Sequence, residues 1–373
     1  MQFTPFDLEY TQSVWEQKVD FNLTESGVHP IRLDELLGDD SDKLSEMLAT
    51  EINYPHVNGD PELRENIAKL YNGAGVENVL VTVGAAEANN IVMQTIMEPG
   101  DELVTQSPTY KQIWGLALNA GHMVKPFHML SDKGWALDID DLNAQVSDKT
   151  RIIAVCNPNN PTGYILTDDE MDAIVAAADS VGAWILADEV YRGAERLREE
   201  ETASFFGRYD KVLALGSMSK AYGLPGLRVG WVVGPPDTIE DIWRRHEYTT
   251  ITASMLSNLL ATYALSGDVR PRLLQRTRDY IRKGFPVLEA WMNKQDGLFS
   301  YTPSQASAVT FIRYHLDINS TELMEKLCRD ASVFVGAGDS FGMDHHIRIA
   351  FGQDKAVLDE AFSRIEKTLR TLA

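Results

Sequence analysis

Lys220 is the residue whose surroundings most strongly suggest chemistry. It follows a short apolar run, Val212–Leu215, it is flanked by Ser217 and Ser219, and Arg228 comes eight residues later. A lysine amine that is held in place, with its pKa drawn down, can form a Schiff base with an aldehyde. Hydroxyls and a guanidinium are the groups that an anionic phosphate needs. A reactive lysine beside a phosphate cradle suggests pyridoxal 5′-phosphate.

The alternative for any single lysine is an exposed surface residue. The segment that follows Lys220, GLPGLRVGW, carries glycines and a proline in place of the polar side chains of a charged surface helix. Glycine allows the backbone to approach a ligand closely. This context favours the reactive lysine.

Asp188 follows a second apolar run, Ala183–Ala187. A carboxylate at that place carries a desolvation cost unless it is paired, and a protonated pyridine nitrogen would be such a partner. Tyr191, three residues later, could hold the 3-hydroxyl of the same ring. The alternative is an aspartate that caps a helix or forms a salt bridge.

Three further loops follow apolar runs. NPNNPTG (Asn157–Gly163) is made rigid by two Asn-Pro steps and leaves Asn160 to donate to a ligand oxygen, although it can also be a plain turn. Tyr110 of SPTY could lay its ring on a planar ligand or simply pack. GAAEANN, from Gly84, offers the free N–H groups of a helix N-terminus to a phosphate, or is an ordinary strand-to-helix turn.

Arg348 lies within the otherwise apolar run Ile347–Phe351. An arginine there is costly unless it is paired, and its planar fork matches a carboxylate with two hydrogen bonds. An internal salt bridge is the competing interpretation.

The elements that must position these residues alternate along the chain. Short apolar runs, several of them apolar throughout as in strands buried on both faces, alternate with helix-like segments such as Ala86–Met97 and Asp168–Val181. The pattern predicts a mostly parallel sheet covered by helices, whose ligands lie beyond the carboxyl ends of the strands. The predicted strands are Val79–Val83, Glu102–Gln106, Met123–Phe127, Arg151–Cys156, Ala183–Ala187, Val212–Leu215 and Val229–Val233.

The pattern changes after about Asp237, where a smaller α+β domain is expected. We predict a large cofactor-binding domain over residues 41–285, and a small domain made of residues 1–40 and 286–373. The elements predicted after Asp237 are long helices at Ile239–Leu265 and Val269–Asn293, strands at Ala308–Tyr314 and His346–Phe351, and a last helix at Lys355–Leu372.

Composition excludes several classes of protein. The 373 residues carry a net charge of −21, which argues against a nucleic-acid partner. Cys156 and Cys328 are far apart, so neither a disulfide framework nor a thiolate metal site is expected. There is no signal-peptide pattern and no apolar run long enough for a membrane span. We therefore expect a cytoplasmic protein that binds no metal and contacts no membrane.

The ordered motifs resemble the class I/II aminotransferases, which are fold-type I enzymes that depend on pyridoxal phosphate. In order along the chain they are NLTESGVHP, YPHVNGDPELR, VGAAE, SPTY, NPNNPTG, DEVY, SMSKAYGLPGLRVGW and HIRIAFG. The resemblance covers nearly the whole chain. It implies the α/β fold-type I architecture, with a large domain built on a mostly parallel sheet and a smaller α+β domain.

The resemblance also implies roles for individual residues. Lys220 would be the Schiff-base lysine and the acid/base for the proton shift, and Asp188 would pair with the pyridine nitrogen. A tyrosine at position 54 would reach the phosphate from a neighbouring subunit, so a homodimer with shared active sites is implied. The other implied contacts are Tyr191 and Asn160 to the 3-oxygen, Tyr110 stacked on the ring, Ser217, Ser219, Arg228 and the backbone of Ala85 and Ala86 to the phosphate, and Arg348 with Gly27 to the substrate carboxylate. The pair Ala85-Ala86 departs from the family, because it lacks the hydroxyl often found in this loop.

The function implied is amino-group transfer between an L-amino acid and a 2-oxo acid. ESGVH and SKAYGLPGLRVGW are similar to capreomycidine synthase-like members of the family, which are cyclases. A lyase, cyclase or oxidase that acts on an amino acid is therefore the alternative. NPNNPTG and DEVY favour ordinary transamination. A non-catalytic regulatory module is a third hypothesis, disfavoured because the chain has no helix-turn-helix extension or basic patch.

Overall fold

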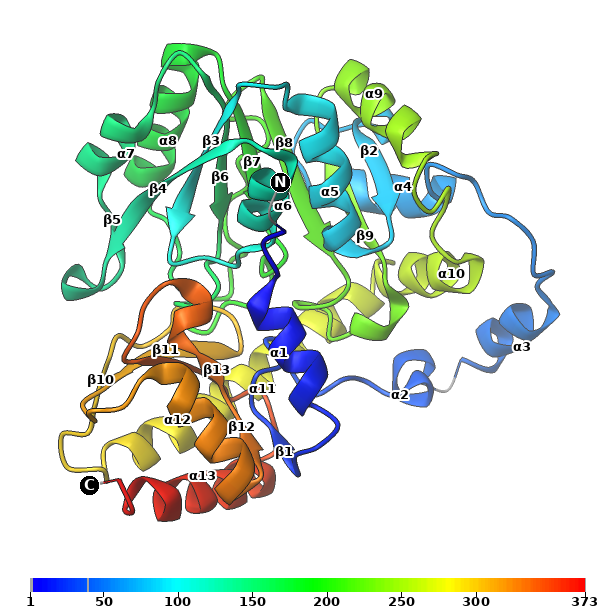
Figure 1. The fold of residues 1–373 in the computed structure, drawn as a ribbon. Helices are drawn as coiled ribbons and strands as arrows, with labels where there is room; N and C mark the ends of the chain where they lie inside the picture. Colours follow the sequence, from blue (N-terminus) through cyan, green and yellow to red (C-terminus); the bar gives the residue numbers. More distant parts are fainter. Residues whose placement is uncertain (1–2, 39, 373) are drawn as a thin grey trace.

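The computed structural model describes residues 3–38 and 40–372, and its largest element is an eight-stranded mixed sheet (Figure 1). The five neighbouring strands β8, β7, β6, β3 and β4 are parallel, whereas β9 runs antiparallel to both β8 and β2. The order across the sheet is β2 (Val79–Thr82), β9 (Gly230–Val233), β8 (Val212–Ser217), β7 (Trp184–Asp188), β6 (Thr150–Cys156), β3 (Glu102–Ser107), β4 (Met123–Leu130) and β5 (Ala136–Leu137). The predicted parallel, helix-covered sheet is confirmed.

Helices cover both faces of this sheet because its strands are apolar on both sides. One face packs on α5 (Gly84–Ile96), α6 (Gln112–Ala120) and α9 (Pro236–His246) through a cluster of buried aliphatic side chains. The opposite face packs on α4 (Pro61–Ala68), α7 (Ile139–Gln145) and α8 (Asp168–Val181). Alternate residues of one strand serve the two faces: Leu80 belongs to the first cluster, and Val79 and Val81 to the second.

A second, antiparallel sheet lies beside the large one (Figure 1). Its order is β10 (Phe299–Tyr301), β11 (Val309–Tyr314), β14 (His346–Ala350) and β13 (Gly336–Ala337). The helices of this region are α11 (Val269–Met292), α12 (Ser320–Lys326) and α13 (Lys355–Leu369). The N-terminal segment joins this part of the chain, because β1 (Phe21–Asn22) pairs in parallel with β12 (Val333–Phe334).

The predicted long helix Ile239–Leu265 is wrong. Two helices, α9 and α10 (Met255–Ala264), occupy that stretch, and residues 247–254 between them are not helical. The break contains the run Thr249–Thr252, whose β-branched side chains disfavour helix. In contrast, α11 runs without interruption across residue 285, where we placed the domain boundary. The two-domain division stays a prediction.

Residues 40–56 extend away from the body of the molecule (Figure 1). The helix α2 (Leu33–Leu37) precedes it and packs on the body through the buried Leu36 and Leu37. The extended segment contains α3 (Ser41–Ala49), followed by a stretch without regular structure. It exposes large apolar side chains, among them Leu48, Ile52 and Tyr54, which is 80% exposed. In the described part of the chain, no helix combines the length and the apolar character needed to cross a membrane.

Candidate active site

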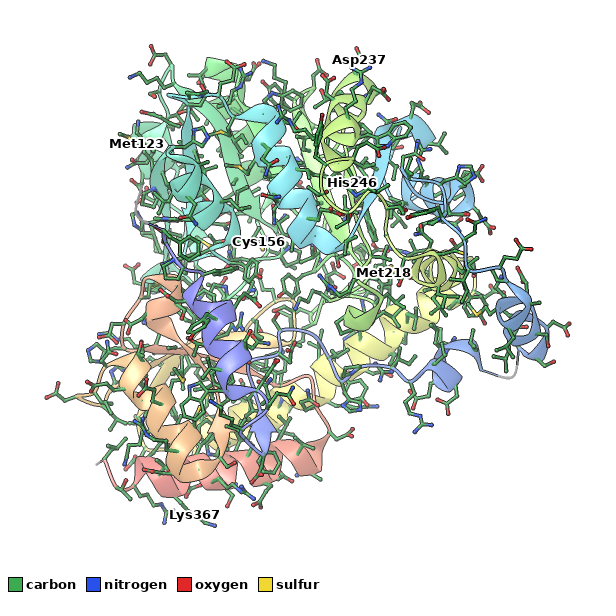
Figure 2. The ribbon with its side chains drawn as sticks, turned by 45° about the vertical axis from the view of Figure 1, so that its right-hand side comes forward. Met123, Cys156, Met218, Asp237, His246 and Lys367 are labelled. Atoms are coloured by element: carbon green, nitrogen blue, oxygen red, sulfur yellow. The ribbon has the colours of Figure 1, made fainter. Side chains whose placement is uncertain are left out.

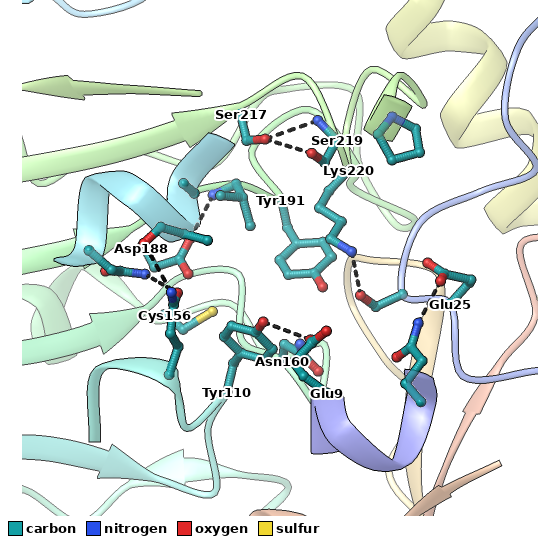
Figure 3. Close-up of a pocket in the computed structure, with 18 of the residues that line it drawn as sticks. Glu9, Glu25, Tyr110, Cys156, Asn160, Asp188, Tyr191, Ser217, Ser219 and Lys220 are labelled. Atoms are coloured by element: carbon teal, nitrogen blue, oxygen red, sulfur yellow. Dashed lines mark hydrogen bonds between the residues drawn. The ribbon is translucent and has the colours of Figure 1, made fainter. Parts of the chain in front are cut away.

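A cavity of about 340 Å³ lies where the carboxyl ends of β2, β3, β6, β7 and β8 face the small sheet and α1 (Asp7–Trp15) (Figures 2 and 3). Figure 2 shows Cys156, the last residue of β6, at the edge of the large sheet that faces the small sheet. Every residue predicted to bind the cofactor lines this cavity except Tyr54, and so does the predicted carboxylate-binding Arg348. These residues are Ala85, Ala86, Tyr110, Asn160, Asp188, Tyr191, Ser217, Ser219, Lys220 and Arg228.

Lys220 directs its amine into the cavity (Figure 3). Its Nζ donates a hydrogen bond to Ser26 Oγ at 2.8 Å. Burial lowers the pKa of Lys220 below its ordinary value, and Arg348 lowers it further, although the negative charge of Glu25 acts in the opposite direction. A lower pKa leaves more of the amine unprotonated near neutral pH, which is the form that attacks a carbonyl or accepts a proton.

Asp188 lies at the end of β7 with its carboxylate toward the cavity. Its Oδ1 accepts a hydrogen bond from the backbone N–H of Val190 at 3.2 Å, and burial raises the pKa of Asp188 to about 6. Tyr191 is buried beside it. The Tyr191 hydroxyl lacks a well-formed hydrogen bond, with Ser26 close by, and burial raises its pKa well above the ordinary value. Both side chains are short of polar partners within the protein.

The protein without cofactor should therefore be destabilised by Asp188 above pH 6. The folded state holds this proton more tightly than the unfolded state, so the cost is absent below about pH 4 and complete above about pH 6. The difference from the ordinary pKa of 3.8 corresponds to at most about 3 kcal/mol. We expect Asp188→Asn to be more stable than the wild type in urea unfolding at pH 7.5, and to lose this advantage at pH 4. An equal difference at both pH values would contradict the assignment.

The residues predicted to form a phosphate cradle, Ser217, Ser219, Arg228 and the first turn of α5, lie together in the cavity. Ser217 Oγ donates to Ser219 Oγ at 2.9 Å, and Arg228 Nη1 lies 3.4 Å from Ser219 Oγ. Gly84, which has a φ of 72°, lets the guanidinium approach the start of α5, because a β-carbon there would lie 2.4 Å from Arg228 Nη2. The helix N-terminus, two hydroxyls and one guanidinium together suit an anion.

Arg348 enters the cavity from β14 of the small sheet and is only 2% exposed. Its Nη1 donates to Asn160 Oδ1 at 2.9 Å, and its Nη2 donates to the backbone carbonyl of Thr24 at 2.7 Å. Its Nε is buried without a partner. Three segments that are distant in sequence thus orient one guanidinium, which retains the capacity to bind a carboxylate.

Tyr110 connects the cavity to the N-terminal helix. Its hydroxyl donates to Glu9 Oε1 at 2.7 Å, and its ring meets Phe6 edge-on with 5.0 Å between centroids. Leu8 anchors the same helix in a buried cluster that includes Phe341. These contacts hold α1 against the cavity, while stacking of Tyr110 on a ligand ring stays a prediction.

The sequence did not point to several residues that line the cavity. They come from the N-terminal segment and from positions in or beside the quoted motifs to which no role was assigned: Glu9, Gln12, Glu25, Ser26, Asn89, Gln112, Cys156, Val190 and Pro225. The spacing of Glu9 and Gln12, three residues apart, could have indicated a shared helix face. Nothing in the sequence indicated that this face would meet the cavity.

Gly27 and Tyr54 do not line the cavity within this chain. A β-carbon at Gly27 would lie 3.4 Å from the carbonyl oxygen of Ser219, so the glycine is close to the lysine loop. Tyr54 lies in the exposed extension. The roles assigned to these two residues stay predictions.

The chain matches known proteins over most of its length. A protein-family model described as aminotransferase class I and II matches residues 42–365. Capreomycidine synthase of Streptomyces vinaceus is 30% identical over 363 residues, covering 94% of this chain and 90% of that protein. An aspartate aminotransferase of Streptomyces avermitilis is 28% identical over 340 residues, covering 85% and 81%. The crystal structure of a PLP-dependent aminotransferase from Streptococcus suis 89-1591 superposes with a TM-score of 0.93 at 28% identity, over 100% of this chain and 99% of that one.

Proposed function

The chain belongs to the class I and II aminotransferases, whose cofactor is pyridoxal 5′-phosphate, and from this premise we propose that it transfers an amino group between an L-amino acid and a 2-oxo acid. One observation carries the proposal: Lys220, Asp188 and Arg348 line a single cavity although they come from three distant parts of the chain. An amine of lowered pKa, a buried carboxylate and a carboxylate-binding guanidinium are the groups that this reaction requires.

The residues present fit the cofactor. The cradle at Ser217, Ser219 and Arg228 suits its phosphate, and Asp188 suits its protonated pyridine nitrogen. The buried Tyr191 hydroxyl, short of a partner in the protein, suits the 3-oxygen of the ring. Once bound, pyridoxal phosphate supplies an electron sink for the negative charge that develops at the substrate α-carbon.

The protein side chains supply the proton transfers and the orientation. Lys220 would remove the proton from the substrate α-carbon as the general base and would then donate a proton as the general acid, since its lowered pKa makes it an effective base. Arg348 holds the α-carboxylate and thereby fixes which bond of the α-carbon faces Lys220. Asn160, which accepts from Arg348, links the carboxylate site to the ring site.

We also propose that the active enzyme is a cytoplasmic homodimer. The apolar side chains exposed on residues 40–56, including Leu48 and Ile52, support an interface there. Tyr54 in the same segment would then reach the phosphate of the neighbouring subunit. The cytoplasmic location rests on Cys156 and Cys328, which are buried and unpaired. Sedimentation equilibrium of the holoenzyme tests the dimer.

A screen of amino donors tests the proposed reaction. Each L-amino acid is mixed with the purified holoenzyme, and the visible absorbance of the bound cofactor is followed with and without a 2-oxo acid. We expect at least one donor to abolish the band and an oxo acid to restore it, with the new amino acid formed in equal amount. Release of ammonia, or formation of a cyclised product without any oxo acid, would contradict amino transfer and favour the lyase or cyclase alternative.

A further inference from the structure

We propose that the preferred amino donor carries a cation at the end of its side chain, a guanidinium or an ammonium, and that Glu9 and Glu25 recognise it. This inference rests on the proposed function, because it names the substrate class of the same cavity.

Glu9 and Glu25 reach the cavity from two separate segments on the side opposite Asp188 (Figure 3). Each carboxylate is held by one side chain: Tyr110 Oη donates to Glu9 Oε1 at 2.7 Å, and Gln12 Nε2 donates to Glu25 Oε1 at 2.5 Å. Within residues 3–38 and 40–372, the Oε2 atom of neither glutamate accepts a hydrogen bond. Two positioned carboxylates therefore each keep one oxygen free at the cavity lining, with Glu25 half-buried and Glu9 exposed.

Some of the charged side chains that line the cavity have a partner of opposite charge on the cofactor or substrate in the proposed reaction, and others do not. Arg228 meets the cofactor phosphate, Arg348 meets the substrate carboxylate, and Asp188 meets the pyridine nitrogen. Lys220 meets the cofactor aldehyde in the proposed reaction. Among the described residues that line the cavity, Glu9 and Glu25 are then the charged groups without a counterpart from the cofactor or the α-amino acid group. A cation on the donor side chain would balance them, whereas a carboxylate on the side chain would be repelled.

The buried guanidinium of Arg348 points independently to a ligand in the cavity, and its position determines how the substrate is oriented there. This guanidinium is almost fully buried, lines the cavity and has an Nε without a partner among the described residues, so it is suited to anchor the carboxylate end of the substrate. With the reacting amine directed to Lys220, the side chain is left to extend along the N-terminal segment. Glu9 and Glu25 both exert an electrostatic effect on Lys220 and Arg348, which places all four groups in one neighbourhood.

The two carboxylates are fixed well enough to select a substrate. Glu9 and Gln12 lie three residues apart on α1, so they share a face of that helix. The buried Leu8 and the contact between Phe6 and Tyr110 hold the helix in place. A planar guanidinium, with several donors in a fixed fork, suits two carboxylates better than a single ammonium does.

Pairs of donors with equal shape and different charge test the proposal. The holoenzyme is given arginine and its neutral analogue citrulline, then lysine and 2-aminoheptanoate, in which a methyl group replaces the ammonium, and kcat/KM of the donor half-reaction is measured. We expect the cationic donor of each pair to be favoured at least about tenfold. Glu25→Gln and Glu9→Gln should each reduce this preference about tenfold. Glu16→Gln, which removes the same charge from a residue that does not line the cavity, is the matched control and should leave the preference unchanged.

A binding measurement separates this inference from the proposed function. 5-Guanidinopentanoate carries the guanidinium and carboxylate of arginine without the α-amine. 5-Ureidopentanoate has the same shape and carboxylate but ends in an uncharged urea group. Neither acid has an α-amine, so neither can react. By calorimetry with the holoenzyme we expect the guanidino acid to bind at least about tenfold more tightly, and Glu25→Gln to remove the difference. Equal binding of the two acids, or equal kcat/KM for arginine and citrulline, would overturn the inference. If no donor discharges the cofactor while the guanidino acid still binds selectively, the proposed function fails and the recognition stands.

Discussion

Replacement of Lys220 by alanine should lower kcat for amino transfer by at least about a thousandfold. The amine serves as nucleophile and as acid/base, and a positioned general base alone contributes about a hundredfold to ten-thousandfold. Lys220→Arg should be almost as damaging, because a guanidinium stays protonated and cannot act as either. The measurement is single-turnover loss of donor by the holoenzyme, with cofactor content determined separately.

Lys149→Ala is the matched control, since Lys149 is exposed and does not line the cavity. It should retain wild-type kcat. If Lys220→Ala retained more than a tenth of the wild-type rate with cofactor bound, Lys220 would be neither the nucleophile nor the base. In that case another group of the cavity would have to supply the proton transfers.

Replacement of Arg348 by lysine or alanine should lower kcat/KM about a hundredfold or more for every L-amino acid donor. Each hydrogen bond between charged groups contributes about 1.5–3 kcal/mol, and the loss of a two-point contact removes two of them. Lysine keeps the charge but lacks the planar fork. Arg348→Lys should therefore recover only part of the kcat/KM that Arg348→Ala loses. Steady-state kinetics against a series of donors measures the effect.

Arg313→Ala provides the control for Arg348, because Arg313 lies on the adjacent strand β11 with an exposed side chain. Its kcat/KM should stay close to that of the wild type. Arg348 also holds Asn160 and the Thr24 carbonyl, so thermal unfolding must be compared to separate a folding defect from a binding defect. Donors whose carboxylate is blocked as an amide should react poorly with the wild type and no worse with the variant. A further loss with the blocked donors would show that Arg348 acts elsewhere.

Most of the large sheet could be predicted because its signals are local. A strand buried on both faces must be apolar throughout, and a parallel sheet brings the carboxyl ends of its strands to one edge. Asp188, Asn160 and Lys220 could thus be assigned to one site from their place after apolar runs. The helix over Ile239–Leu265 was mispredicted because apolar content alone does not reveal where a β-branched run interrupts a helix.

The sequence by itself determined the cofactor chemistry of this protein. A few consecutive residues were enough to predict three features: the segment around Lys220, the carboxylate at Asp188 and the glycine turn at Gly84. Each feature is local, because a phosphate-binding loop and a strand end are formed by neighbouring residues. Only the tertiary structure decided what surrounds that chemistry. Glu9 and Glu25 line the cavity because α1 packs on the cluster around Phe341 and β1 pairs with β12. These contacts join residues far apart in the chain, so no local sequence pattern near either glutamate could predict them.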